Sequence, residues 1–193
     1  MPIHLILGGA RSGKSAYAEK LATKSGLPVT YIATAQVYDD EFKARVQHHK
    51  DRRPDDWQLV EEAHLLSNIL SNIIGDALQA NIHAASGDAK NARGKKCIII
   101  DCLTLWLAQC ICPDCVPPQG IDWNEQRANF LAILPTLDAE IIIVSNEVGM
   151  GIVPLGEINR QFQDEQGRLN QTVAAIADKV SFIAAGLPIK LKG

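Results

Sequence analysis

The chain has 193 residues, of which 47% are hydrophobic and 21% charged, and a formal net charge of -3. These values suit one domain over residues 1–193 with a full hydrophobic core, and they disfavour general nucleic-acid binding, which requires a basic face. No apolar run reaches membrane-spanning length, and the run before the first glycine is too short for a secretory signal. We therefore expect a cytoplasmic protein that has no membrane span and binds no nucleic acid.

The first predicted element is a strand over Ile3–Leu7, which leads into a glycine-rich loop and then a segment of helical composition, Ser15–Lys24. The loop fits the phosphate-binding pattern G-x-x-x-x-G-K-[ST] in the required context of strand, loop and helix. Backbone N–H groups and the helix N-terminus favour an anion there, the lysine is expected to reach the β and γ phosphates, and the serine hydroxyl is the predicted Mg²⁺ ligand. The predicted nucleotide-binding residues of this loop are Gly8, Gly9, Ala10, Arg11, Ser12, Gly13, Lys14 and Ser15, with Ser15 as the metal ligand.

Further strand-like runs alternate with segments of helical composition along the chain. They lie at Val29–Ala33, Cys97–Asp101, Ile141–Ser145 and Val180–Ala184. Continuous rather than alternating apolar runs are typical of parallel strands that are covered on both faces. The expected fold is α/β and P-loop NTPase-like, a mostly parallel β-sheet with helices on both faces and ligands at the carboxyl ends of the strands. Residues 84–96 and 112–120 are predicted to be irregular connections.

A short basic segment, Arg45–Pro54, contains four cations and two adjacent histidines and is followed by Trp57. One interpretation is a solvated charged helix end that Pro54 terminates. The other is an imidazole held among cations beside a nucleotide, because neutral histidine is a good nucleophile toward phosphorus and the cations neutralise the charge that grows on the phosphate. The residues alone leave both interpretations open.

Three more segments carry candidate functional groups. Asp101 ends an apolar strand, as the acid near Mg²⁺ does in P-loop proteins, but this pattern is also common at the start of a loop. The segment Ser145–Pro154 is either a shaped functional loop or a simple turn into a helix that begins at Glu157. By itself, Gly167–Gln171 would be taken for an exposed helix face.

The chain contains five cysteines, an odd number that fits a reduced compartment better than a disulfide framework. Three of them, Cys110, Cys112 and Cys115, are close enough in sequence to suggest a structural zinc site. The alternative is a loop that happens to carry cysteines, because no second Cys pair or nearby histidine completes a tetrahedral ligand set.

Together these segments resemble the bifunctional adenosylcobinamide kinases and adenosylcobinamide-phosphate guanylyltransferases of cobalamin synthesis. The resemblance covers most of the chain in five ordered motifs, whereas the cysteine cluster falls outside it. The motifs lie at Gly8–Ser15, Tyr31–Thr34, Arg45–Trp57, Asn146–Pro154 and Gly167–Gln171.

The resemblance implies two reactions: phosphorylation of adenosylcobinamide, and transfer of GMP from GTP to adenosylcobinamide phosphate through a guanylylated histidine. Motif spacing assigns this nucleophile to His49, with the adjacent His48 as its competitor. The resemblance also implies GTP, ATP and Mg²⁺ as cofactors, and a homo-oligomer, with a trimer expected. Beyond the phosphate loop, the nucleotide contacts that it implies are Ala33, Thr34, Ala35, Lys50, Asp51, Arg52, Arg53, Glu61 and Asp101.

The predicted roles of the acidic residues Glu61 and Asp101 rest on different arguments. The carboxylate of Glu61 could accept hydrogen bonds from the N1 and N2 donors of guanine, which is a hypothesis about GTP selectivity. The position of Asp101 is often Glu in this family, so its metal role rests less firmly on the resemblance.

Two other functions compete with this interpretation. An ordinary P-loop small-molecule kinase would need no covalent intermediate and no histidine. A GTP-dependent switch protein would carry an Asn-Lys-x-Asp guanine motif, which the sequence lacks.

Overall fold

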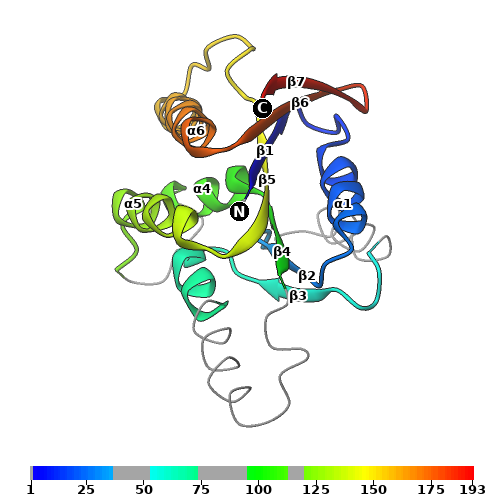
Figure 1. Ribbon diagram of the computed structural model, residues 1–193. Coiled ribbons are helices and arrows are strands. Elements are labelled where there is room, and N and C mark those ends of the chain that lie inside the picture. Colours follow the sequence, from blue (N-terminus) through cyan, green and yellow to red (C-terminus); the bar gives the residue numbers. More distant parts are fainter. Residues whose placement is uncertain (1, 37–52, 74–94, 113–119) are drawn as a thin grey trace, which may run out of the picture.

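One seven-stranded sheet runs through the residues that the computed structural model describes, which are 2–36, 53–73, 95–112 and 120–193 (Figure 1). The strands pair in the order β3-β2-β4-β5-β1-β6-β7. Every neighbouring pair is parallel except β6 and β7, which form an antiparallel hairpin. The strands are β1 (Ile3–Gly8), β2 (Val29–Ala33), β3 (Gln58–Glu61), β4 (Lys96–Asp101), β5 (Ala139–Asn146), β6 (Lys179–Ala184) and β7 (Leu187–Lys192).

Helices cover both faces of the sheet, which confirms the predicted α/β fold (Figure 1). Helix α1 (Lys14–Ser25) packs on one face, where its Ala18 and Ala22 join the core beneath it. The other face carries α4 (Leu103–Ile111), α5 (Trp123–Ile133), α6 (Glu157–Ile176) and the helical residues 66–73, and the 3₁₀ turn η1 (Leu134–Thr136) follows α5. None of the described helices combines the length and the apolar character that crossing a bilayer requires.

The larger core lies between the sheet and the second helical layer, and its centre is Trp106 of α4. The Trp106 ring is fully buried, with ring centroids 5.0 Å from Trp123 and 5.0 Å from Phe130 of α5. Its indole Nε1 donates a hydrogen bond of 2.7 Å to the His64 carbonyl, so this buried N–H is satisfied. Because α4 starts at Leu103, this packing also holds the end of β4 in place.

All five strands predicted from the sequence are confirmed, whereas β3 and β7 were not predicted. Both are edge strands: three of the four β3 residues and all six β7 residues are exposed, so neither forms a continuous apolar run. The irregular connection predicted over 84–96 ends one residue too late, because Lys96 already belongs to β4. The rest of it, except residue 95, lies outside the described residues, as do residues 113–119 of the second connection.

Candidate nucleotide site

Most of the predicted site residues that the structure describes meet at the edge of the sheet where the parallel strands end. Gly8 of β1 pairs with Asn146 of β5 in the strand register. Ala33 of β2 pairs with Asp101 of β4 on one side and Glu61 of β3 on the other. Strand pairing therefore brings together residues that are far apart in the sequence, as expected for a ligand site of a parallel sheet.

The phosphate loop packs directly against the β6–β7 hairpin. Gly8 has a φ of 153°, and a Cβ atom added there would lie 2.4 Å from the Ile183 carbonyl oxygen. Gly13 has a φ of 100°, and its added Cβ would lie 3.2 Å from Cα of Gly186. The Gly186 N–H also donates a 2.8 Å hydrogen bond to the Ser12 carbonyl. Two of the loop glycines are thus required by close backbone packing.

Two polar groups of the loop are available to an anion. The side chain of Lys14 is in the first turn of α1 and is 7% exposed, and its Nζ donates a 2.5 Å hydrogen bond to the Gly9 carbonyl. Burial lowers the pKa of Lys14, and the nearby Asp101 carboxylate opposes this shift. Buried Ser12 Oγ has no hydrogen-bond partner within the described part of the chain. Nucleotide phosphates would supply acceptors to both groups.

A second set of contacts joins Asp101 to the end of the basic segment. The hydroxyl of Tyr31 donates a 2.6 Å hydrogen bond to Asp101 Oδ2. The Arg53 guanidinium carbon lies 3.6 Å from the centroid of the Tyr31 ring, and Trp57 stacks on the same ring at a centroid distance of 6.4 Å. Arg53 Nε and Nη1 are buried and have no hydrogen-bond partner among the described residues. Cation–π contact therefore holds this cation at the site edge with donors to spare for an anion.

The protonation state of Tyr31 follows from its surroundings. Burial, followed by the charge of the Asp101 carboxylate, raises the pKa of Tyr31 well above its usual value. The phenol therefore remains a hydrogen-bond donor at neutral pH, and it fixes the orientation of Asp101.

Thr34 was predicted to contact the nucleotide together with Ala33 and Ala35, but it is more deeply buried than either of them. Its side chain is fully buried, and its hydroxyl donates to the Cys102 carbonyl at 2.7 Å while accepting from the Cys102 N–H at 2.8 Å. The Thr34 side chain thus ties the end of β2 to the start of α4. Ala33 and Ala35 are half-buried, and Glu61 is exposed at the end of β3. Nucleotide contact by these residues stays a prediction.

The loop that follows β5 is anchored by a buried amide network. Ser145 Oγ donates a hydrogen bond to Asn170 Oδ1 at 2.7 Å. Gln166 Nε2 donates to Ser145 Oγ at 2.9 Å and to Asn170 Oδ1 at 3.0 Å. Asn170 Nδ2 then donates to the Asn146 carbonyl at 3.0 Å. The Asn146 N–H in turn donates to Thr104 Oγ1 at 2.7 Å. Helices α6 and α4 therefore fix the point at which the chain leaves β5 beside the phosphate loop.

This network corrects the interpretation of Gly167–Gln171 as an exposed helix face. Leu169 and Asn170 are 0% and 5% exposed, because they lie on the side of α6 that faces the sheet. Sequence reasoning also missed Gln166, which is fully buried. Its spacing of four from Asn170 is the available signal, since residues i and i+4 share a helix face.

Ser15 and Asp101 carry oxygen groups of the kind that Mg²⁺ prefers. Ser15 lies in the first turn of α1 next to Lys14, and Asp101 is close enough to Lys14 to affect its pKa. Mg²⁺ keeps several waters and takes only one or two protein ligands beside the phosphates of a substrate. Among the described residues, no three or more His, Cys, Asp or Glu side chains are arranged to hold a metal ion without such help.

Several predicted groups lie outside the described residues. These are His48, His49, Lys50, Asp51 and Arg52 of the basic segment, together with Cys115 of the cysteine cluster. Of the other two cysteines in that cluster, Cys110 is buried, and burial followed by the charge of Glu62 raises the pKa of its thiol to about 12. Without a metal ion, this thiol is therefore neutral at pH 7. The zinc hypothesis stays a prediction.

The glycine-rich loop on the end of β1, its buried lysine and the carboxylate on β4 define a P-loop nucleotide-binding protein. Residues 4–191 match the family described as cobinamide kinase / cobinamide phosphate guanyltransferase. The chain belongs to this family of cobalamin-biosynthesis enzymes.

Curated relatives agree with the family over nearly the whole chain. The bifunctional adenosylcobalamin biosynthesis protein CobP of Pseudomonas aeruginosa is 44% identical over 98% of this chain and 96% of the relative. The protein CobU of Escherichia coli, described in the same words, is 34% identical over 97% and 98% of the two chains. CobU of Salmonella typhimurium is 35% identical over the same shares.

A solved structure supports the fold alone. It comes from work on a prototypical ATPase of the type III secretion system of pathogenic bacteria, and it aligns with a TM-score of 0.52 at 11% identity. The alignment covers 98% of this chain and 56% of that one.

The packing of the phosphate loop predicts that alanine destabilises the fold at Gly8 but not at the neighbouring Gly9. Gly8→Ala should lower the free energy of unfolding of the nucleotide-free protein by about 2–4 kcal/mol, because the new methyl overlaps the Ile183 carbonyl. Gly9→Ala is the matched control, because a Cβ there meets nothing within 4 Å. Urea unfolding of both variants measures the difference, and equal stabilities would contradict the described packing.

The amide network predicts a similar contrast on α6. Asn170→Ala should destabilise the fold by about 1–3 kcal/mol, because it leaves buried polar partners unsatisfied, and it should lower turnover by loosening the loop after β5. Gln171→Ala changes the exposed neighbour and should leave both quantities within error. Denaturation and steady-state kinetics of the two variants provide the test, and an unaffected Asn170→Ala enzyme would argue against this role.

Proposed function

We propose that the enzyme phosphorylates adenosylcobinamide and then transfers GMP from GTP to adenosylcobinamide phosphate, with His49 as the residue that carries GMP. Motif spacing assigns this role to His49, and one observation supports a phosphate-handling role for the end of its segment: the contacts that run from Lys14 through Asp101 and Tyr31 to Arg53. They connect the phosphate loop to the last cation of the basic segment.

In the proposed transfer, a ring nitrogen of neutral His49 attacks the α-phosphorus of GTP. A P–N bond forms, the bond from this phosphorus to the bridging oxygen breaks, and pyrophosphate leaves with the electron pair. A phosphate oxygen of adenosylcobinamide phosphate then attacks the same phosphorus and breaks the P–N bond. The products are adenosylcobinamide-GDP and the free imidazole, and Arg53 and Lys14 balance the phosphate charge throughout.

The proposed kinase step uses the same loop. The substrate hydroxyl attacks the γ-phosphorus of ATP or GTP, its proton is released, and the nucleoside diphosphate leaves. Lys14 and the loop N–H groups stabilise the charge on the transferred phosphoryl group. Mg²⁺, held by Ser15 and Asp101, would neutralise charge on the β and γ phosphates. In this scheme Glu61 recognises the N1 and N2 donors of guanine.

An ordinary P-loop kinase without a covalent intermediate is the alternative. It would use the phosphate loop in the same way and would leave the histidines of the basic segment without a chemical role. The position of Arg53 favours the transferase, because a cation with two unpaired buried nitrogen atoms at the site edge fits a second phosphate-handling step.

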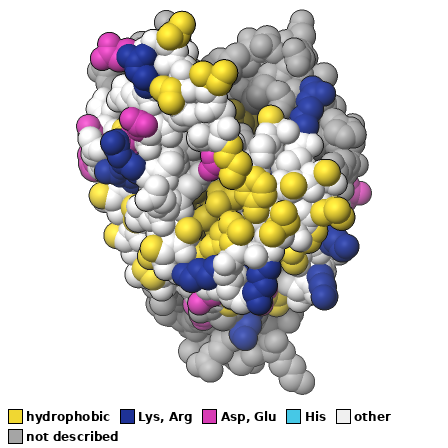
Figure 2. Space-filling model, turned by 90° about the horizontal axis from the view of Figure 1, so that it is seen from above, with side chains coloured by type: hydrophobic (Ala, Val, Ile, Leu, Met, Phe, Trp, Pro, Cys, Tyr) yellow, Lys and Arg dark blue, Asp and Glu magenta, His cyan; other side chains and the backbone are white. Residues whose placement is uncertain are grey.

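We also propose that copies of this chain assemble as a trimer through one apolar end of the molecule. Exposed large hydrophobic side chains are concentrated on β7 and on the loop between β5 and α6, and Figure 2 shows hydrophobic side chains gathered on this end of the molecule. On β7, Leu187, Ile189 and Leu191 alternate with the residues of the opposite face, so they form one apolar row on an unpaired edge strand. The exposed residues of the loop include Met150, Ile152, Val153 and Leu155. An exposed apolar surface of this kind favours a partner that shields it from water.

Labelling tests the proposed nucleophile. Incubation with GTP labelled at the α phosphate should yield an adduct that is labile to acid and stable to alkali, as expected for a phosphoramidate. The adduct should disappear in His49→Ala and survive in His48→Ala. No adduct in the wild-type protein would favour the ordinary kinase, and loss of the adduct only in His48→Ala would reassign the nucleophile.

Sedimentation tests the proposed assembly. The wild-type protein should sediment at three times the chain mass of 21.0 kDa. Replacing Leu187, Ile189 and Leu191 together by serine should shift it to a single chain. Leu59→Ser is the control, because Leu59 is an exposed apolar residue on the opposite edge strand β3. A monomeric wild-type protein would refute this proposal without touching the proposed chemistry.

A further inference from the structure

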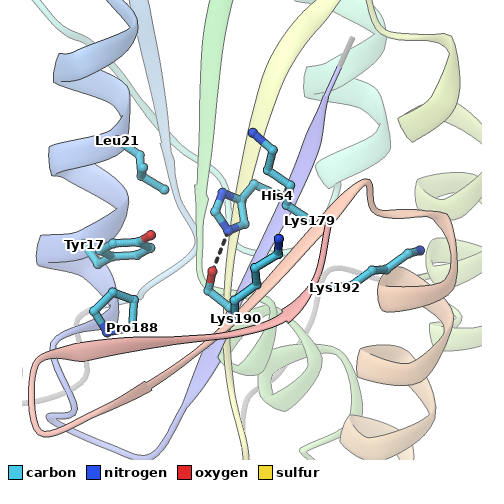
Figure 3. A pocket seen from close by; sticks show the side chains of 8 residues that line it. His4, Tyr17, Leu21, Lys179, Pro188, Lys190 and Lys192 are labelled. Carbon is cyan, nitrogen blue, oxygen red and sulfur yellow. Dashed lines mark hydrogen bonds between the residues drawn. The ribbon is translucent and has the colours of Figure 1, made fainter.

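A basic pocket lies away from the nucleotide edge, in the notch between α1 and the β6–β7 hairpin (Figure 3). Its volume is about 320 Å³, which is the size of a small-molecule site. Its floor is the face of β1 and β6 that carries His4 and Ser181, and its walls come from α1 and β7.

Two lysines give this pocket its charge. Lys179 pairs with His4 in the register of β6 and β1, and Lys190 pairs with Ser181 in the register of β7 and β6. Neither lysine has an ion-pair partner within the described part of the chain. The third lysine that lines the pocket, Lys192, directs its ammonium toward α6, where it donates 3.0 Å hydrogen bonds to the carbonyls of Ala174 and Ala175 (Figure 3). The described residues that line the pocket include no carboxylate, although the chain as a whole is negative.

The polar centre of the pocket is a neutral imidazole. His4 Nε2 lies 2.9 Å from Ser181 Oγ, at hydrogen-bond distance, and Ser181 is 7% exposed. Burial and the charge of Lys179 lower the pKa of His4, so this ring adds no third cation but can exchange a hydrogen bond with a ligand. The two free ammonium groups are therefore the charged recognition elements.

Apolar groups line the other side of the pocket. Tyr17 and Leu21 lie one turn apart on α1, and Pro188 faces them from β7 (Figure 3). The Tyr17 ring meets the His4 ring edge to face, at a centroid distance of 6.3 Å. A ring or short hydrocarbon of a ligand could pack against these groups while its anionic end reaches the lysines.

We propose that this pocket binds a small molecule that carries a phosphate group. Lys179 and Lys190 neutralise the phosphate, and the apolar wall holds the remainder of the ligand. Two ammonium groups match the double charge of a phosphate monoester better than the single charge of a carboxylate. Two free lysines are too few for nucleic acid, because a stable complex needs a row of phosphate contacts.

The pocket contains no residue of the phosphate loop, so it is a separate anion site. Its walls are nevertheless the elements that flank the loop: Tyr17 is three residues beyond Lys14 on α1, and Pro188 is two residues beyond Gly186, which bonds to Ser12. A ligand that spans α1 and β7 would therefore contact both supports of the nucleotide site.

Phenyl phosphate is a suitable probe, because it combines a ring with a phosphate. The titration uses full-length Lys14→Ala protein, in which binding at the phosphate loop is suppressed, and follows the His4 imidazole signal by NMR together with the heat of binding. We expect saturable binding of one equivalent that perturbs His4. Inorganic phosphate should bind roughly tenfold more weakly, because it buries no ring. The His4 signal locates binding in the wild-type chain as well, should the Lys14 variant fail to fold.

Matched variants test the residues. Lys179→Gln and Lys190→Gln keep exposed side chains of similar length and should each weaken phenyl phosphate binding by roughly fivefold. Lys20→Gln, an exposed lysine of α1 outside the pocket, should have no effect. Unchanged affinity in the Lys179→Gln/Lys190→Gln double variant, or no saturable binding that shifts His4, would overturn the proposal. Benzoate that binds as tightly as phenyl phosphate would overturn the assignment to phosphate.

Discussion

The close packing of the phosphate loop on the β6–β7 hairpin is the constraint on which the nucleotide site depends. The loop leaves β1 at Gly8 under the carbonyl of Ile183, and it enters α1 at Gly13 against Gly186. A hydrogen bond from Gly186 to Ser12 closes the contact. Since a side chain fits at neither glycine, the hairpin sets the path of the loop and hence the direction in which its N–H groups and Lys14 face.

Strand order explains how the rest of the site forms around this loop. The order β3-β2-β4-β5-β1 sets the ends of five parallel strands side by side, so Glu61, Ala33, Asp101 and Asn146 follow one another along the same edge as Gly8. Tyr31 contacts both Asp101 and Arg53, so it holds Arg53, near the end of the basic segment, at this edge. The same parallel topology that gives the fold its buried strands thus supplies the place where two phosphate-handling steps could share one nucleotide.

The sequence predicted the five buried strands, the phosphate loop and the family because these features leave local or ordered patterns. It missed β3 and β7, whose exposed residues form no apolar run, and it misread the side of α6 that holds Asn170. The Tyr31–Asp101 bond and the His4–Ser181 contact join residues 70 and 177 positions apart. No local pattern carries such pairings, because they depend on which strands become neighbours.

The burial of Lys14 links the fate of the folded enzyme to its substrates. Folding removes the Lys14 ammonium group from water, and this burial costs stability. The Gly9 carbonyl, which accepts its hydrogen bond, and the nearby Asp101 carboxylate offset only part of that cost. A bound triphosphate would supply the negative charge and the hydrogen-bond acceptors that the ammonium group loses when it leaves water. Because only the folded chain binds it, the nucleotide would stabilise the folded state. Loss of the nucleotide moves the balance toward open forms, which proteases cleave more readily. The resistance of the folded chain to proteolysis is therefore coupled to nucleotide concentration through one side chain.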